Sequence, residues 1–131
     1  MKTLIIGDNT DVMQAIEDLL RESYGFEINK LPYRQKFMKQ DIEKLQEAEL
    51  IVLDLTAANA NLRLLISEIR TILPEVKIMA LHFYKEISLV QALIKVGANA
   101  YLPIDTLYQE MGQAIENLQK GLNYVSTEVA V

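Results

Sequence analysis

The chain has 131 residues, which is enough for one domain of ordinary size, and half of them are hydrophobic, which excludes a largely disordered chain. Its 13 Lys and Arg against 18 Asp and Glu give a net charge of −5, which argues against binding nucleic-acid phosphates through clustered cations. Without cysteine there is no disulfide framework, thiolate nucleophile or zinc-finger ligand set, and a single histidine excludes a histidine-rich metal site.

The first half of the chain alternates short apolar runs with segments of helical period. Residues 3–6 are uniformly apolar, which predicts a strand buried on both faces, and residues 12–20 repeat apolar positions at helical spacing. Residues 26–31 alternate as a half-buried edge strand does, and Pro32 ends them. The polar, amphipathic residues 37–45 predict a helix with the weakest pattern of the set.

The second half repeats this order of elements. Its expected strands are residues 50–54, 76–81 and 98–102. Its expected helices are residues 61–73, 86–96 and 106–120, each followed by Pro or Gly. The whole pattern amounts to five βα units, which predicts an α/β fold with a five-stranded parallel sheet and helices on both faces.

The domain organisation follows from the same pattern. We expect residues 1–125 to form a single domain and residues 126–131 to be a tail or the start of a linker. No stretch reaches the roughly 18 apolar residues of a membrane span, and the first apolar run stops at Gly7. We therefore expect a cytoplasmic protein that makes no membrane contact.

Functional groups of a doubly wound sheet gather where its parallel strands end. Reading those ends in chain order gives Asp8, Asp54, His82 and Ile104. Two neighbouring carboxylates repel each other unless a cation or proton lies between them, and oxygen ligands of this kind suit Mg²⁺. Aspartates after strands also cap turns and helices, so position alone leaves metal binding and capping open.

Five blocks of the sequence resemble, in order and spacing, the receiver domains of two-component response regulators that carry LuxR-type outputs. The blocks are LIIGDN at 4–9, LIVLDL at 50–55, KIMAL at 77–81, ALIKVGANAYL at 92–102 and GLNYVS at 121–126. The resemblance covers nearly the whole chain and implies a flavodoxin-like (βα)5 receiver fold. It also implies that Asp54 is the candidate phosphoacceptor of a signal-transduction domain.

Three positions depart from the phosphorylation equipment that this resemblance implies. Gly7 stands where a second carboxylate is expected, His82 where Ser or Thr is expected, and Ile104 where Lys is expected. Ile104 supplies no charge to phosphoryl oxygens, and His82 lacks the hydroxyl that would follow them. We therefore expect a degenerate site in which His82, Tyr101 and Ile104 occupy the switch positions.

The metal site implied by the resemblance is also reduced. Its remaining ligands are Asp8, Asp54 and the backbone carbonyl of Thr56. Because one carboxylate fewer offsets the dehydration of the ion, Mg²⁺ is expected to bind weakly, and no other cofactor is expected.

The last two helices carry more apolar residues than one buried face requires. The expected interaction surface consists of Ile87, Val90, Ile94, Tyr108 and Ile115. Because the resemblance places dimerisation of the family on this side, we expect contacts with other proteins and a homodimer.

These features favour a pseudo-receiver in two-component signalling, without enzymatic activity, that acts through protein–protein interaction or as the regulatory domain of a transcription factor. A sensor histidine kinase is the partner that the resemblance implies, and direct nucleic-acid binding is not expected. One alternative is a working phosphorelay receiver phosphorylated on Asp54, which the retained Asp8 supports. Another is a flavin- or nucleotide-binding domain of the same topology, against which the carboxylates Asp8 and Asp11 count because a phosphate would lie there.

Overall fold

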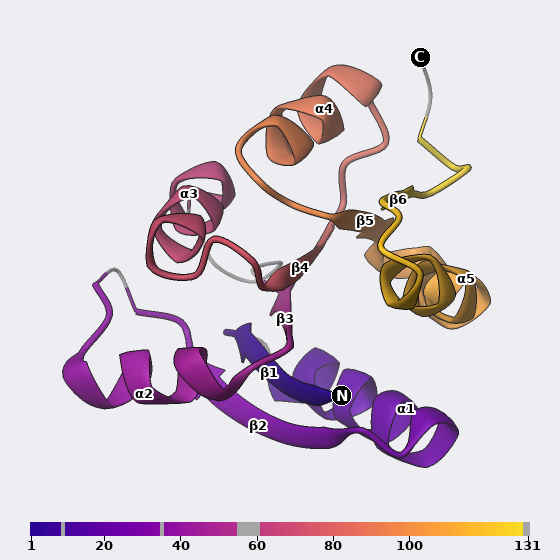
Figure 1. Ribbon diagram of the computed structural model, residues 1–131. Coiled ribbons are helices and arrows are strands. Elements are labelled where there is room, and N and C mark those ends of the chain that lie inside the picture. Colours follow the sequence, from indigo (N-terminus) through magenta and orange to yellow (C-terminus); the bar gives the residue numbers. More distant parts are fainter. Residues whose placement is uncertain (9, 35, 55–60, 130–131) are drawn as a thin grey trace.

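The computed structural model describes residues 1–8, 10–34, 36–54 and 61–129 (Figure 1). Its strands are β1 (Lys2–Gly7), β2 (Glu27–Pro32), β3 (Leu50–Asp54), β4 (Lys77–His82), β5 (Ala100–Pro103) and β6 (Tyr124–Val125). Its helices are α1 (Thr10–Tyr24), α2 (Lys39–Glu47), α3 (Leu62–Ile72), α4 (Ile87–Lys95) and α5 (Leu107–Gln119), with a 3₁₀ turn, η1 (Ile104–Thr106), before α5. This alternation confirms the predicted α/β class.

Within the described residues the strands form one sheet in the order β2-β1-β3-β4-β5-β6, and every neighbouring pair is parallel. The five predicted strands all form, close to their expected bounds. The sixth strand corrects the predicted five-stranded sheet. Because β6 has only two residues, it carries no periodicity from which a strand is predicted.

Helices cover both faces of this sheet (Figure 1). Ile5 and Met79 belong to the core that packs against α1 and α5, whereas Ile51 and Ile78 belong to the core under α2, α3 and α4. Successive residues of a strand point to opposite faces, so a strand covered on both sides is apolar at every position. β3 is buried along its whole length, which places Asp54, its last residue, at the centre of the molecule.

Helix α3 shows how local signals set an element's bounds. The side chain of Asn61 accepts a hydrogen bond from the Leu64 amide at 3.0 Å and so satisfies a donor at the helix start. At the other end, Pro74 cannot continue the hydrogen-bond ladder, and the helix stops at Ile72. The predicted range 61–73 is confirmed to within one residue at each end.

Helix α2 begins two residues later than predicted, at Lys39 instead of residue 37. The cause is Asp41, which is 1% exposed. Its carboxylate accepts a hydrogen bond from the Met38 amide at 2.8 Å and is paired with the Arg34 guanidinium. This bond fixes Met38 as the residue before the helix.

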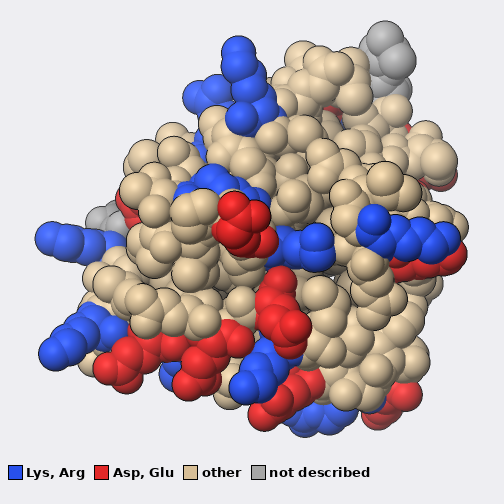
Figure 2. Space-filling model, in the orientation of Figure 1, with Lys and Arg blue, Asp and Glu red and all other residues tan. Residues whose placement is uncertain are grey.

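The exposed surface mixes charges of both signs. Figure 2 shows Lys and Arg interspersed with Asp and Glu over one face of the molecule, and few charges over the part occupied by α4. Such a mixture is typical of a solvated face and not of a phosphate-binding one. Among the described residues, no helix combines the length and the apolar character needed to cross a membrane.

Candidate functional site

The register of the sheet brings the predicted site residues together at one edge. Gly7 of β1 and Leu81 of β4 both pair with Asp54 of β3, so the three strands end side by side. Asp8 follows Gly7 and His82 follows Leu81, which places both beside Asp54. Asp8, Asp54 and His82 therefore lie at the same edge of the sheet, whereas Thr56 lies outside the described residues.

Asp54 is fully buried, with 0% of its surface exposed. A carboxylate that is to attack a phosphodonor in solution has to meet that donor at the surface, with charge-stabilising groups already around it. Asp54 is recessed from solvent at the strand ends, and the bearing of this on phosphoryl transfer is part of the proposed function.

Gly7 lies in a corner that has no room for a larger residue. A Cβ atom added at Gly7 would stand 2.8 Å from the backbone oxygen of Asp54 and 2.9 Å from Cγ and Sδ of Met13. The loss of the carboxylate is thus matched by a methionine that fills the space beside it. Sequence reasoning found Gly7 but missed Met13, which reads only as an ordinary apolar position of the first helix.

His82 is a neutral ring in this setting. It stacks on Tyr84 with ring centroids 4.2 Å apart, and its Nδ1 atom has no hydrogen-bond partner among the described residues. Burial lowers the pKa of His82, and the negative charges of Asp54 and Asp8 oppose that shift only in part. The imidazole is therefore uncharged at neutral pH and does not replace the missing cation.

Tyr101, the predicted aromatic switch position, is fully buried. Its hydroxyl donates a hydrogen bond to the backbone oxygen of Tyr84 at 2.7 Å, and the two rings lie nearly parallel with centroids 6.5 Å apart. Burial raises the pKa of Tyr101 well above its usual range. Tyr84 thus connects His82 to Tyr101, a role that its loop position in the sequence did not reveal.

Ile104 makes apolar contacts and has no group that donates a hydrogen bond. It opens η1 and contacts the core under α1 and α5. The neighbouring Asp105 pairs with Lys85 at 2.7 Å, and the two side chains are 60% and 46% exposed. The one ion pair of this stretch among the described residues therefore faces solvent, and Ile104 adds only apolar contact.

No protein-family model and no curated protein matches the chain. Solved structures do match it. The isolated receiver domain of RcsB from Salmonella enterica serovar Typhimurium, in the presence of phosphomimetic BeF3⁻, gives a TM-score of 0.80 at 18% identity and covers 98% of this chain and 95% of that one. A LuxR-family two-component response regulator from Aurantimonas gives a TM-score of 0.82 at 17% identity, over 98% and 91%. The chain has the receiver-domain fold.

A longer structure extends this comparison. The RcsB response regulator of Salmonella typhimurium matches with a TM-score of 0.79 at 18% identity, over 98% of this chain. The chain spans 64% of the length of that protein. Identities this low establish the receiver fold alone, and the activities of these proteins belong to them.

Few groups that could ligate a metal stand at the strand ends among the described residues of this receiver fold. Asp8 and Asp54 are the carboxylates at the edge, and the described residues contain no cluster of three His, Asp or Glu side chains arranged to hold a metal. Met13 fills the corner in which a further carboxylate would stand. Weak binding of Mg²⁺ remains a prediction.

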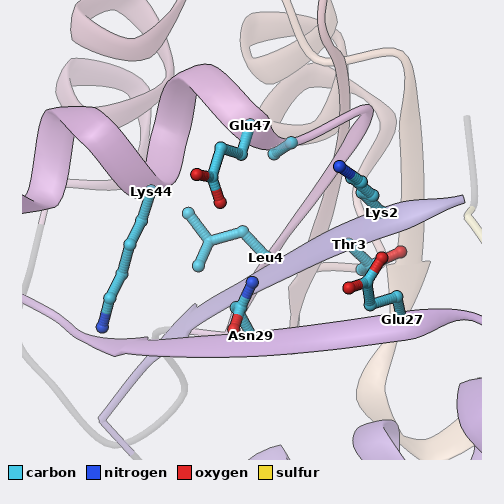
Figure 3. Close-up of a pocket in the computed structure, with 8 residues that line it drawn as sticks. Lys2, Thr3, Leu4, Glu27, Asn29, Lys44 and Glu47 are labelled. Carbon is cyan, nitrogen blue, oxygen red and sulfur yellow. The ribbon is translucent and has the colours of Figure 1, made fainter.

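A hollow of about 320 Å³ adjoins Asp8 in this receiver fold. It is lined by Gly7, Asp8, Met13, Gln14, Lys30 and Pro32. Lys30 and Gln14 are its polar groups beside Asp8, and the carboxylate of Asp8 stands where a phosphate would lie, which disfavours a flavin or nucleotide here. A second pocket, at the opposite end of the strands, holds only about 30 Å³ between β1, β2 and α2, which is room for little more than water (Figure 3).

The predicted interaction surface needs correction at two of its five positions. Val90 and Ile115 are 0% and 1% exposed, because both point from their helices into the sheet. Ile87 and Ile94 are partly exposed, and Tyr108 is 66% exposed. The predicted surface did not include Phe83 and Leu89, two exposed apolar residues beside Ile87. Their exposure depends on how the helix and the preceding loop are turned against the sheet.

Proposed function

We propose that this domain is a pseudo-receiver, a signalling module that acts through protein–protein contacts without a regulated phosphorylation cycle on Asp54. The receiver fold supports the signalling class. The observation that carries the loss of phosphorylation is the packed corner of Asp54, which is 0% exposed beside Gly7 and Met13. Enzymatic activity is not part of this proposal, and its proposed location is the cytoplasm.

The electrostatics of the site support the same conclusion. Phosphoryl transfer needs positive charge or hydrogen-bond donors around oxygens that gain charge in the transition state. Ile104 supplies neither, and the lowered pKa of His82 keeps its ring neutral. The residues that remain acidic, Asp8 and Asp54, add negative charge instead. Transfer to Asp54 is therefore slowed at several points at once.

The proposed partners are proteins. Phe83 and Leu89 are exposed apolar side chains before and on α4, and Tyr108 is an exposed one on α5, where it lines a hollow with α1. Exposed apolar side chains of this kind are what a protein-binding or self-associating surface requires. By analogy with LuxR-family regulators, the proposed setting is the regulatory domain of a transcription factor, with a sensor kinase or a second copy of the chain as partner.

Labelling with a small phosphodonor tests this proposal. Wild type and Asp54→Ala are incubated with acetyl phosphate and Mg²⁺ at neutral pH, and intact mass is followed with time. We expect no mass increase in wild type beyond that of Asp54→Ala. The double variant His82→Thr with Ile104→Lys regains a hydroxyl and a cation, and each such donor is worth about a hundredfold in rate, so this variant is expected to label faster than wild type.

The opposite result has a definite meaning. Rapid, Mg²⁺-dependent labelling of wild type that disappears in Asp54→Ala would contradict the pseudo-receiver and establish the working phosphorelay in its place. That alternative draws its support from Asp8 and Asp54, which lie at the same edge of the sheet.

A further inference from the structure

The chain returns along the open edge of the sheet after α5. Residues 124–125 form β6, which pairs in parallel with β5 so that Tyr124 lies opposite Ala100 and Val125 opposite Tyr101 (Figure 1). The Tyr124 amide donates to the Asn99 oxygen at 3.0 Å, and the Ser126 amide donates to the Tyr101 oxygen at 3.1 Å. The segment thus covers backbone groups of β5 that would otherwise form an open edge.

Glu110 of α5 holds this segment in place. One carboxylate oxygen accepts hydrogen bonds from the Tyr124 hydroxyl at 2.6 Å and from the Thr127 amide at 3.2 Å. The other accepts the Ser126 hydroxyl. Glu110 and Ser126 are both buried, at 9% and 3% exposure. Among the described residues no Lys or Arg forms an ion pair with Glu110, so neutral donors carry the whole contact.

The ionisation of Glu110 depends on the segment. Burial acts to raise the pKa of Glu110, but hydrogen bonds from the Ser126 and Tyr124 hydroxyls and from the Thr127 amide outweigh it and hold the pKa below its ordinary value. Burial and the same carboxylate raise the pKa of Tyr124 to about 12. A buried carboxylate that loses its hydrogen-bond donors costs free energy of folding. Glu110 therefore stabilises residues 124–127 in their place, and these residues in turn stabilise the buried, ionised Glu110.

The segment also reaches the candidate site through Tyr101. The Tyr101 carbonyl accepts the Ser126 amide, while its hydroxyl donates to the Tyr84 oxygen and Tyr84 stacks on His82. Val125 and Val129 pack against the same core cluster as Tyr101. Contacts therefore run without a break from the C-terminal segment to the strand ends.

We propose that residues 124–129 form a strap that seats on the edge of β5 as a unit, with Glu110 as its clamp, and that the seated strap fixes Tyr101 and Tyr84. Residues 124–129 are then seated or released together with the contacts of Tyr101 and Tyr84. The strap rests on these contacts and does not require the proposed signalling role.

Amide hydrogen exchange followed by NMR tests the strap. The variant is Glu110→Gln, and the matched control is Glu116→Gln, which removes the same charge from an exposed position of the same helix. In Glu110→Gln we expect exchange at Tyr124, Ser126 and Thr127 to quicken about tenfold or more, while β1 and β3 keep the wild-type rates. The amide signals of Tyr101 and Tyr84 should shift in the same variant and stay unchanged in the control.

A second variant distinguishes a local effect on the strap from a general loss of stability. Tyr124→Phe removes one donor and leaves Glu110 in place, and it should quicken exchange at the same amides to a smaller extent. Unchanged exchange at Ser126 and Thr127 in both variants would overturn the clamp. Equal acceleration in β3 would overturn the strap as a separate unit. Faster exchange in the strap with unmoved Tyr101 and Tyr84 signals would overturn the connection to the switch position.

Discussion

Gly7 is closely enclosed by its neighbours. Met13 packs into the space beside Gly7, and the backbone oxygen of Asp54 closes the other side. A larger side chain at position 7 would therefore meet both Met13 and the backbone of Asp54. The close packing of this edge is a property of several residues together.

This packing predicts a steep cost for the smallest addition. Gly7→Ala places a methyl group 2.8 Å from a backbone oxygen, so we expect a loss of about 1–3 kcal/mol in the free energy of unfolding, measured with urea. Gly112→Ala is the matched control, since its Cβ meets only the hydroxyl tip of Tyr24 and the helix gains from alanine. A Gly7→Ala variant as stable as the control would contradict the filled corner. Met13→Ala, added to Gly7→Ala, should recover part of the lost stability.

His82 predicts a pH dependence of stability. Its pKa is lower in the folded chain than the ordinary value of 6.5, so the unfolded chain binds the proton more readily. The contribution of His82 is therefore complete above about pH 6.5 and is lost as the pH falls below that value. Asp54 and Asp8 are the charges that limit the effect.

The check compares wild type with His82→Phe, which keeps a ring against Tyr84 but does not titrate. Between pH 7 and pH 5 the unfolding free energy of wild type should fall more than that of the variant, as followed by urea denaturation at each pH. If the unfolding free energies of the two proteins fall in parallel with pH, folding does not lower the pKa of His82, and the prediction is wrong.

At the scale of elements, the sequence predicts most of the architecture. The bounds of β3 match the prediction residue for residue, because its first four positions, covered on both faces, are apolar and Asp54 ends the run. Helix α2 is displaced because Asp41, which reads as a surface residue, is buried against Arg34. β6 escapes prediction because its support, Glu110, lies 14 residues before Tyr124 in the sequence and belongs to another element.

The sequence likewise predicts some features of the candidate site and misses others. The ends of consecutive apolar strands predict that Asp8, Asp54 and His82 meet, and they do. The burial of Val90 and Ile115 and the roles of Met13 and Tyr84 depend on the rotation of helices and loops against the sheet. An amphipathic pattern that is apolar over more than one face leaves that rotation open.

The two faces of α5 give an element-scale prediction. If the exposed face of α5 around Tyr108 carries a homodimer, Tyr108→Glu should yield a folded monomer by sedimentation, because Tyr108 is 66% exposed. Ile115→Glu places a charge at a position that is 1% exposed and should instead unfold the domain, as read by circular dichroism. Wild type that sediments as a monomer at high concentration would contradict self-association and leave a foreign protein as the partner.

At the scale of the whole molecule, the receiver fold is complete in its sheet and helical layers, and the proposed pseudo-receiver differs from a working one at the strand ends alone. The sheet, both helical layers and the buried Tyr101 are in place, yet Asp54 is recessed, Ile104 is apolar and His82 is neutral. The fold therefore supplies a stable scaffold and surfaces for partners, and the C-terminal strap adds a connection between those strand ends and the chain beyond. Function is expected to depend on surfaces and not on turnover at Asp54.

The most direct measurement is a titration with Mg²⁺ and beryllofluoride, the phosphomimetic present in the RcsB receiver structure, followed by amide NMR signals of the intact chain. The pseudo-receiver predicts no saturable shift at Asp54, His82 or Tyr101 with beryllofluoride and, at most, weak shifts with millimolar Mg²⁺ near Asp8. Saturable shifts at Asp54 that extend to Tyr101 and vanish in Asp54→Ala would contradict it, because they would mean that the site still binds a phosphoryl group and transmits its presence.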